Sequence, residues 1–288
     1  MSPPPLEAIL GHVRAEPSRT WSIIISFFGD AIVPRGGAVW LGTLLGFFKG
    51  LDVAETVVRS AMSRLAAEDW LTRTRQGRNS YYHLAERGRE TFAQAAQRIY
   101  HHRPPAWTGA FDAFLVEPAA REAVREALDQ AGFGVPLPGV FVAPQGGIIP
   151  QAGANLPRLS LSGTPDALRE LAARAWKLDE LGVAYARFCA VFGPLEAALA
   201  QGAQLSSLES IMARVLLIHE YRRIVLRDPV LPPAILPAPW SGDEARRLCA
   251  ALYRHLLSPS ERWLDQHAIG ANGTPLPANP EITSRFKD

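Results

Sequence analysis

The 288-residue sequence predicts an α+β protein with several domains, because three kinds of pattern follow one another along the chain. Helical periodicity and a basic hairpin fill the first hundred residues. Short strands then alternate with helices, and long helical patterns fill the last third. Breaks near residues 104 and 178 separate these regions. We therefore expect a tail at 1–18 and domains at 19–103, 104–178 and 179–288.

The composition is that of an ordinary globular protein. Hydrophobic residues make up 48% of the chain and charged residues 20%, which argues against a disordered or fibrous protein. The longest apolar run, WSIIISFFGDAIV, contains Asp30 and is too short to cross a membrane. The N-terminal residues MSPPPLEAIL have neither a basic n-region nor a cleavable apolar segment, so we expect no secretion signal. Cys189 and Cys249 have no metal-ligand spacing and fit a reducing compartment, so we expect a cytoplasmic protein without a cofactor.

The first domain is predicted to contain helices followed by a hairpin. Apolar helical patterns cover residues 19–33 and 39–51, with the turn sequence PRGG between them. A third helix is expected to start at Asp52, where D-V-A-E suggests a capping box with Glu55. Its buried stripe has the spacing i, i+3, i+4, i+7 and consists of Val58, Ala61, Met62 and Leu65. Strands at 70–75 and 80–84, a turn containing Gly77 and a helix at 86–100 complete the domain.

This order of elements is that of a winged helix-turn-helix. Seven arginines against three acidic residues lie between Arg59 and Arg89, and residues 1–103 carry a net +4 (13 basic, 9 acidic) against −2 (17 basic, 19 acidic) for the rest. Short polar and basic side chains on a helix can read bases, and a basic hairpin can lie on phosphates. The expected DNA-binding residues are Thr56, Arg59, Ser60, Ser63, Arg64, Arg73, Arg75, Arg78, Asn79 and Tyr81. The alternative is a solvated helix with ordinary surface arginines.

Several segments resemble the PaaX family of bacterial transcriptional repressors. They are FFGDAIVPRGGAVWLGTLLG, VRSAMSRLAAEDWL, GRNSYYHL, RIY and the downstream HEYRRIVLRDPVLPPAILPAPWSG. Gln97 and Phe111 depart from the residues that the family often has, arginine and tryptophan. The resemblance implies control of phenylacetic acid catabolism and release from DNA by an aromatic acyl-CoA such as phenylacetyl-CoA. One recognition helix reads few base pairs, so we expect a homodimer on an inverted repeat of double-stranded DNA.

The middle region predicts a ferredoxin-like βαββαβ domain. Its patterns are a strand in GAFDAFLVE, a helix from Pro118 to Gly132, strands in GVFVAP and RLSLSG, and a helix at 164–176. The resemblance implies the same fold and a similarity to a CRISPR-associated nuclease subunit that binds metal through an acidic residue. Asp112 is the nearest candidate here, but it lies too early in its strand and lacks an acidic partner. We therefore expect no metal.

The last third predicts an all-α effector and dimerisation domain with helices at 178–192, 195–203, 208–226 and 243–257. The segment DPVLPPAILPAPW, with its five prolines, is expected to cross between helices in irregular conformation. An acyl-CoA needs arginines for its phosphates and aromatic walls for its acyl group. The expected effector-binding residues are Arg187, His219, Tyr221, Arg222, Arg223 and Trp240. The alternative is that Arg222 and Arg223 pair within a structural core, with Glu220 and Asp228 as partners.

Motifs of catalysis are missing from the sequence. It has no phosphate-binding glycine loop, G-x-S-x-G, H-E-x-x-H or C-x-x-C. Cys189 lies on an apolar helical face and is expected to be a small core residue. Two hypotheses stay open: a DNA-binding regulator, and an enzyme acting on acyl-CoA or nucleic acid that uses its winged helix for assembly. The missing catalytic residues favour the regulator.

Overall fold

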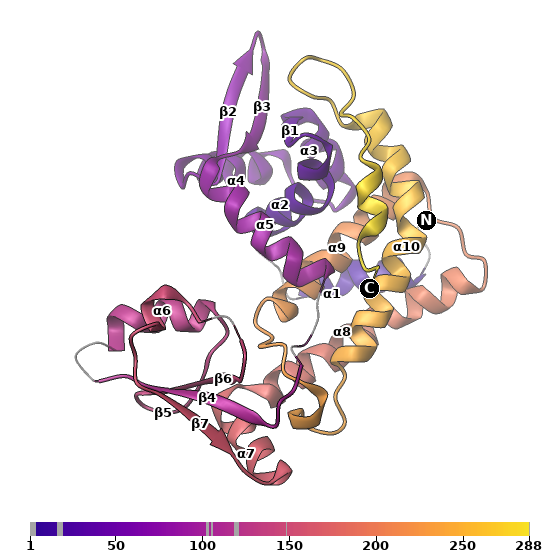
Figure 1. The fold of residues 1–288 in the computed structure, drawn as a ribbon. Coiled ribbons are helices and arrows are strands. Elements are labelled where there is room, and N and C mark those ends of the chain that lie inside the picture. The colour runs from indigo at the N-terminus through magenta and orange to yellow at the C-terminus, as the bar shows by residue number, and fades with distance from the viewer. Residues whose placement is uncertain are drawn as a thin grey trace. The chain divides into compact units, whose positions relative to one another are not determined.

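The computed structural model describes residues 4–15, 20–101, 104, 106–117, 121–147 and 149–287 (Figure 1). The chain mixes helices with two antiparallel sheets. It divides into two compact units. The first holds residues up to His101 together with Arg187–Arg223 and the residues from Glu244 onwards, and the second holds the intervening residues up to Ala186 and Ile224–Asp243. These limits cut across those expected from the sequence, because C-terminal helices pack with the N-terminal residues.

The first unit begins with a helix where a tail was expected. Helix α1 spans Pro4–Ala15 and buries Leu6, Ile9 and Leu10 at helical spacing. Its proline-rich start hid it in the sequence, although proline is tolerated in a first turn. Helix α2 covers Thr20–Phe27, and Arg19, the expected first residue, lies outside the described residues. The chain then passes through a π-helical turn, Phe28–Ile32, and a 3₁₀ turn, Val33–Arg35, rather than one regular helix to residue 33.

The next elements are strand β1 at Ala38–Trp40, helix α3 at Leu41–Gly50 and helix α4 at Glu55–Ala67. The prediction that Asp52 caps α4 is wrong. Asp52 has φ 58° and follows the end of α3, where its N–H donates to the carbonyl of Lys49. Aspartate tolerates this left-handed conformation better than most residues. The N-cap of α4 is Ala54, which makes no side-chain cap.

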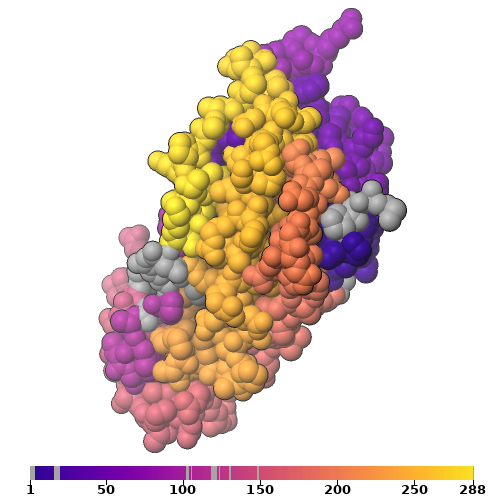
Figure 2. Space-filling model, turned by 90° about the vertical axis from the view of Figure 1, so that its right-hand side faces the viewer, coloured from indigo at the N-terminus to yellow at the C-terminus, as the bar shows by residue number. Residues whose placement is uncertain are grey.

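A three-stranded antiparallel sheet, in the order β1-β3-β2, follows these helices. Strands β2 (Leu71–Gln76) and β3 (Asn79–Leu84) form the predicted hairpin, and Gly77 has the positive φ of 59° that its turn needs. The hairpin projects from the helices of its unit, and its tip is the violet projection at the top of Figure 2. Helix α5 covers Glu86–Tyr100, as predicted.

Three long helices supply most of residues 178–288: α8 (Leu178–Ala200), α9 (Ser207–Val225) and α10 (Gly242–His267). The predicted interruption of α8 and the predicted end of α10 at residue 257 are wrong, because Pro194 and Pro259 lie inside continuous helices. Within the described part of the chain, α8 alone has the length and apolarity of a membrane-spanning helix. Its mean hydropathy is 1.3 over the most apolar window, 22% of which is buried. A core helix can share these properties.

The second unit contains a four-stranded antiparallel sheet in the order β5-β6-β4-β7. Its elements are β4 (Ala110–Leu115), α6 (Arg121–Gln130), β5 (Gly134–Leu137), β6 (Val140–Pro144), a 3₁₀ turn (Gln151–Gly153), β7 (Arg158–Ser162) and α7 (Pro165–Ala175). The order is therefore βαβββα and not the expected βαββαβ. Strand β5 was not predicted, and its pairing is irregular between Gly134 and Leu137. Pro118, the expected start of α6, lies outside the described residues.

Candidate nucleic-acid interface

The exposed face of α4 is the first part of the candidate interface. Val58, Met62 and Leu65 are almost completely buried, as the helical spacing predicted, while Ala61 is half-buried. Because α4 packs against α2, α3 and β2 with this stripe, its other side points to solvent. The expected base-reading residues are all exposed there: Thr56, Arg59, Ser60, Ser63 and Arg64.

The two arginines of α4 are held in surface ion pairs within the helix. Arg59 lies 3.3 Å from Glu55, and Arg64 lies 2.7 Å from Glu68. Both arginine side chains are more than half exposed, and such pairs contribute little free energy. A phosphate or a guanine edge can therefore replace either carboxylate at small cost.

The hairpin supplies a second basic surface. Arg73 donates to the hydroxyl of Ser80 at 3.1 and 2.8 Å, and Arg75 donates to the carbonyl of Gly77 at 3.1 Å. These contacts stiffen the two guanidinium groups without neutralising them. Arg78 and Asn79 are exposed at the tip of the hairpin. The arrangement presents several cations on a projecting two-stranded ribbon, which suits contacts with phosphates.

Tyr81 differs from the other expected DNA-binding residues because it is buried, with 5% of its surface exposed. It pairs across the sheet with Trp40 and Thr74, so its ring supports the hairpin. Val57 was not among the expected DNA-binding residues, but it is 46% exposed on α4. An apolar side chain there can contact a thymine methyl group, but a valine in a helical pattern gave no reason to expect exposure.

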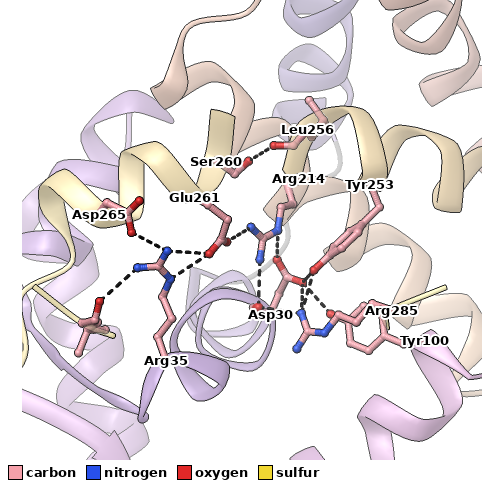
Figure 3. Close-up of polar contacts among 11 residues, drawn as sticks. Asp30, Arg35, Tyr100, Arg214, Tyr253, Leu256, Ser260, Glu261, Asp265 and Arg285 are labelled. Atoms are coloured by element: carbon pink, nitrogen blue, oxygen red, sulfur yellow. Dashed lines mark hydrogen bonds and ion pairs between the residues drawn. The ribbon is translucent and has the colours of Figure 1, made fainter. Parts of the chain in front are cut away.

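A largely buried ionic cluster lies in the same unit as this interface (Figure 3). We call it the Asp30 cluster: Asp30, Arg35, Tyr100, Arg214, Tyr253, Glu261, Asp265 and Arg285. Its three carboxylates balance its three guanidinium groups. The residues come from the η1–η2 turn, the end of α5, α9, α10 and the segment after α10. The cluster therefore joins the N-terminal helices to the C-terminal ones.

Asp30 is the centre of the cluster and has no exposed side-chain surface. Its carboxylate accepts hydrogen bonds from Arg214 at 2.7 Å, Tyr100 at 2.7 Å, Arg285 at 2.9 Å and Tyr253 at 3.0 Å. Burial is the main reason that the pKa of the Tyr100 phenol lies well above its ordinary value, so this hydroxyl remains a donor. Four donors on one buried carboxylate satisfy its charge.

Arg214 and Arg35 share a second carboxylate, Glu261. Arg214 donates to one oxygen at 2.6 Å, and Arg35 donates to the other at 2.7 and 3.0 Å. Arg35 also reaches Asp265 at 2.8 Å and the carbonyl of Leu276 at 3.3 Å. The sequence segment that contains Asp30 and Arg35 leads directly into β1 and α3, so these contacts fix the position of the helices on which α4 packs.

The six expected effector-binding residues differ in burial and in the contacts that they make. Trp240 belongs to the second unit, and the other five residues belong to the first. The ring of Trp240 lies edge-on to the ring of Tyr185. His219 and Tyr221 are buried. Arg222 donates to the Ser26 hydroxyl at 2.6 Å and to the Ser22 hydroxyl and carbonyl at 2.8 and 3.0 Å. Arg223 pairs with Glu220 at 3.1 Å, as the structural alternative expected, and Arg187 is exposed.

Ser26, His219 and Glu220 form an arrangement that superficially resembles a catalytic triad. The Ser26 hydroxyl lies 2.9 Å from His219 Nδ1, and Nε2 lies 3.7 Å from a Glu220 oxygen. However, Ser26 is 2% exposed and its oxygen already accepts from Arg222. Burial, followed by Arg222 and Arg223, lowers the pKa of His219 to about 3. A substrate cannot reach this serine, so the arrangement is structural.

Metal chemistry also finds no support among the residues that the structure describes, where no group of three or more potential ligands occurs. Asp112, the one acidic residue considered from the sequence, is 3% exposed and lies 2.6 Å from Arg158 on the neighbouring strand. Its carboxylate is therefore neutralised by an arginine in the sheet.

Two family models match this chain, and known proteins are similar to it. The family model described as PaaX-like protein matches residues 19–88, and that of the PaaX-like protein C-terminal domain matches residues 176–266. The transcriptional repressor PaaX of Escherichia coli is 34% identical over 268 residues, covering 87% of this chain and 85% of that protein. An uncharacterised protein from Mycobacterium tuberculosis shares the fold, with a TM-score of 0.51, 21% identity and coverage of 77% and 89%. This chain belongs to the PaaX family, a family of regulators rather than enzymes.

Proposed function

We propose that the protein is a transcriptional repressor of genes for the catabolism of phenylacetate-type aromatic acids, acting on double-stranded DNA in the cytoplasm. Its first hundred residues act as a winged helix-turn-helix. Helix α4 reads bases in the major groove, and the β2–β3 hairpin lies on phosphates as the wing. The observation that carries the proposal is the exposed polar and basic face of α4 beside a projecting basic hairpin. The repressor activity of the Escherichia coli relative supports it.

Within this interface, different residues have different roles. Thr56, Ser60 and Ser63 are short enough to bring the helix close to base edges, and Arg59 can donate two hydrogen bonds to guanine. Arg73, Arg75 and Arg78 on the hairpin contribute charge that does not depend on sequence. Tyr81 supports the sheet and makes no contact with DNA.

The repressor works as a homodimer on an inverted repeat. One α4 helix covers only a few base pairs, so two copies related by a two-fold axis are needed for a specific site. Their half-sites are then about 34 Å apart, one turn of DNA, or a multiple of that distance. A sedimentation experiment that finds a monomer at micromolar concentration, and one chain per operator, would contradict the dimer.

An aromatic acyl-CoA, such as phenylacetyl-CoA, releases the protein from its operator. Release requires that the ligand bind the DNA-incompetent conformation more tightly, by about 1–3 kcal/mol of coupling free energy. Because α4 and the hairpin are occupied by DNA, the ligand binds elsewhere in the chain. His219 and Tyr221 are buried, and the half-buried Arg222 donates to Ser26, which argues against these three residues as ligand contacts.

The DNA-binding proposal is tested by fluorescence anisotropy with DNA from the region upstream of the protein's own gene. Arg75→Ala and Arg78→Ala should weaken binding to all sequences and lower the slope of the salt dependence by about 0.9 for each phosphate that the variant no longer neutralises. Ser60→Ala and Ser63→Ala should instead relax the preference at single base positions, each by about 1–3 kcal/mol.

Arg125→Ala is a matched control, because Arg125 is also an exposed arginine but belongs to the second unit. It should leave both affinity and salt dependence unchanged. If the hairpin variants kept the salt dependence of the wild type, the hairpin would not be a phosphate-binding wing. If the wild type bound its upstream DNA no better than random DNA, the repressor proposal would fail.

A further inference from the structure

A cavity of about 250 Å³ lies in the second unit, where the end of α6, strand β5 and the junction of α7 with α8 meet. All of its lining residues belong to that unit. Its apolar lining residues are Phe133, Val135, Ala175, Trp176 and Leu181. Its charged lining residues are exposed to solvent and therefore belong to its mouth; they are Asp129, Lys177, Glu180 and Arg227.

The aromatic wall of the cavity is rigid. Trp176 is 8% exposed, and its indole N–H donates to the carbonyl of Gly132 at 3.0 Å, which fixes the plane of the ring. Gly134 on β5 allows this close approach, because a Cβ atom there would lie 2.6 Å from the indole. Phe133 and Leu181 are each 6% exposed on the other sides. A flat ring can enter this space without rearrangement of the wall.

The mouth places no net negative charge in front of a ligand. Asp129 lies 3.4 Å from Arg125, and Glu180 lies 3.0 Å from Lys177, so each acid has a basic partner. Arg227 adds a further positive charge to the mouth. These side chains, Lys177 above all with 81% exposure, can turn toward an anionic group that stays outside the cavity.

We infer that this cavity binds the aromatic ring of the effector, which is an inference that rests on the proposed release by an aromatic acyl-CoA. Size decides which part of the ligand enters. An apolar cavity of roughly 150 Å³ is enough for benzene, so this one holds a single ring with a short acyl arm. Pockets for whole drug-sized ligands are about 300–1,000 Å³, so a CoA nucleotide stays at the charged mouth.

The cavity lies at the start of α8, so a ring bound in it contacts a helix that continues into the first unit. The ring contacts Trp176 just after α7 and Leu181 in the first turn of α8. Helix α8 continues without interruption past Arg187, where the chain enters the first unit. A ligand that changes the first turn of α8 thus acts on an element that is shared by both units.

The inference is tested with the full-length protein by filling the cavity. Val135 lines it and is 37% exposed, so Val135→Trp should occupy the space where the ring binds. The matched control is Val183→Trp, because Val183 is 70% exposed on α8 and does not line the cavity. Calorimetry with phenylacetyl-CoA should show at least a tenfold loss of affinity for Val135→Trp and less than a twofold change for Val183→Trp. Free CoA should bind the wild type weakly, and equally weakly both variants.

The DNA-binding assay separates the possible failures. If phenylacetyl-CoA bound Val135→Trp as tightly as the wild type, the cavity would not be the site, whereas the repressor proposal would stand. If the wild type bound its operator but no acyl-CoA, both the cavity inference and the release by an acyl-CoA would be overturned. If the wild type bound acyl-CoA but no operator, a selective loss in Val135→Trp would still support the cavity. Should Val135→Trp lower the melting temperature, Val135→Met fills less space and should still weaken binding by several-fold.

Discussion

Replacement of Asp30 by alanine should destabilise the protein more than any surface change near the interface. The substitution leaves Arg214, which has no exposed surface, and Arg285, which is 12% exposed, without the carboxylate that they share. Removing one partner of a buried ion pair costs about 3–5 kcal/mol. The hydroxyls of Tyr100 and Tyr253 lose their acceptor as well. Because Arg214 keeps Glu261 at 2.6 Å, we expect a loss of about 4 kcal/mol, a large part of the 5–15 kcal/mol typical of a folded domain.

Urea denaturation followed by circular dichroism measures this loss as a change in the free energy of unfolding. Asp30→Asn keeps an acceptor oxygen and should cost less than Asp30→Ala. Arg14→Ala is the control, because it removes a surface ion pair with Asp52 in which the two side chains are 50% and 77% exposed, and this loss should cost under about 1 kcal/mol. If Asp30→Ala and Arg14→Ala had equal effects, the Asp30 cluster would not hold the first unit together.

Three further changes test other parts of the first unit. Because burial lowers the pKa of His219 to about 3 from an ordinary 6.5, the unfolded chain binds a proton that the folded chain does not. Stability should therefore fall between pH 6.5 and 5 by up to about 1.4 kcal/mol per unit, and urea midpoints for His219→Gln should depend less on pH. Phe286→Ala should cost about 3–5 kcal/mol in thermal unfolding, since its ring is 4% exposed and lies 5.3 Å from that of Tyr253. Arg222→Ala should cost about 1–3 kcal/mol because it strips three hydrogen bonds from Ser22 and Ser26. The half-exposed Arg223, replaced by alanine, should change stability by less than about 1 kcal/mol, and equal melting temperatures for the two arginine variants would contradict this reasoning.

Local patterns predicted the helix and the hairpin of the candidate interface well, because these elements are defined by short-range spacing. The buried stripe of α4 follows helical periodicity, and the two-residue turn of the hairpin needs the glycine found at Gly77. The failures also have local causes. D-V-A-E resembles a capping box, but the end of α3 holds Asp52 in a left-handed conformation. Strand β5 is short and irregular, so alternation could not reveal it.

Contacts between distant parts of the chain could not be predicted from one sequence. Asp30 interrupted an apolar run, yet its partners Arg214 and Arg285 lie 184 and 255 positions away. The arginines and aromatic residues around position 220 were grouped by type as a ligand site. The fold instead turns Arg222 toward Ser22 and Ser26 on α2 and buries Tyr221. The residues that line the cavity come from three separate stretches of the chain, 129–135, 175–181 and Arg227, and none of these stretches contains a recognisable motif.

The contact between Arg285 and Asp30 can form only after almost the whole chain has been synthesised. Asp30 leaves the ribosome long before Arg285, which lies 255 positions later in the sequence, is added. In the nascent chain, the Asp30 carboxylate therefore lacks one of its partners until synthesis is almost complete. The second unit can close much earlier, because most of it is one continuous stretch up to Ala186. Translation arrested before Arg285 therefore yields chains that contain every proposed DNA-contacting residue but lack the last guanidinium of the Asp30 cluster. Such chains are expected to be substrates for chaperones and proteases instead of competitors for the operator.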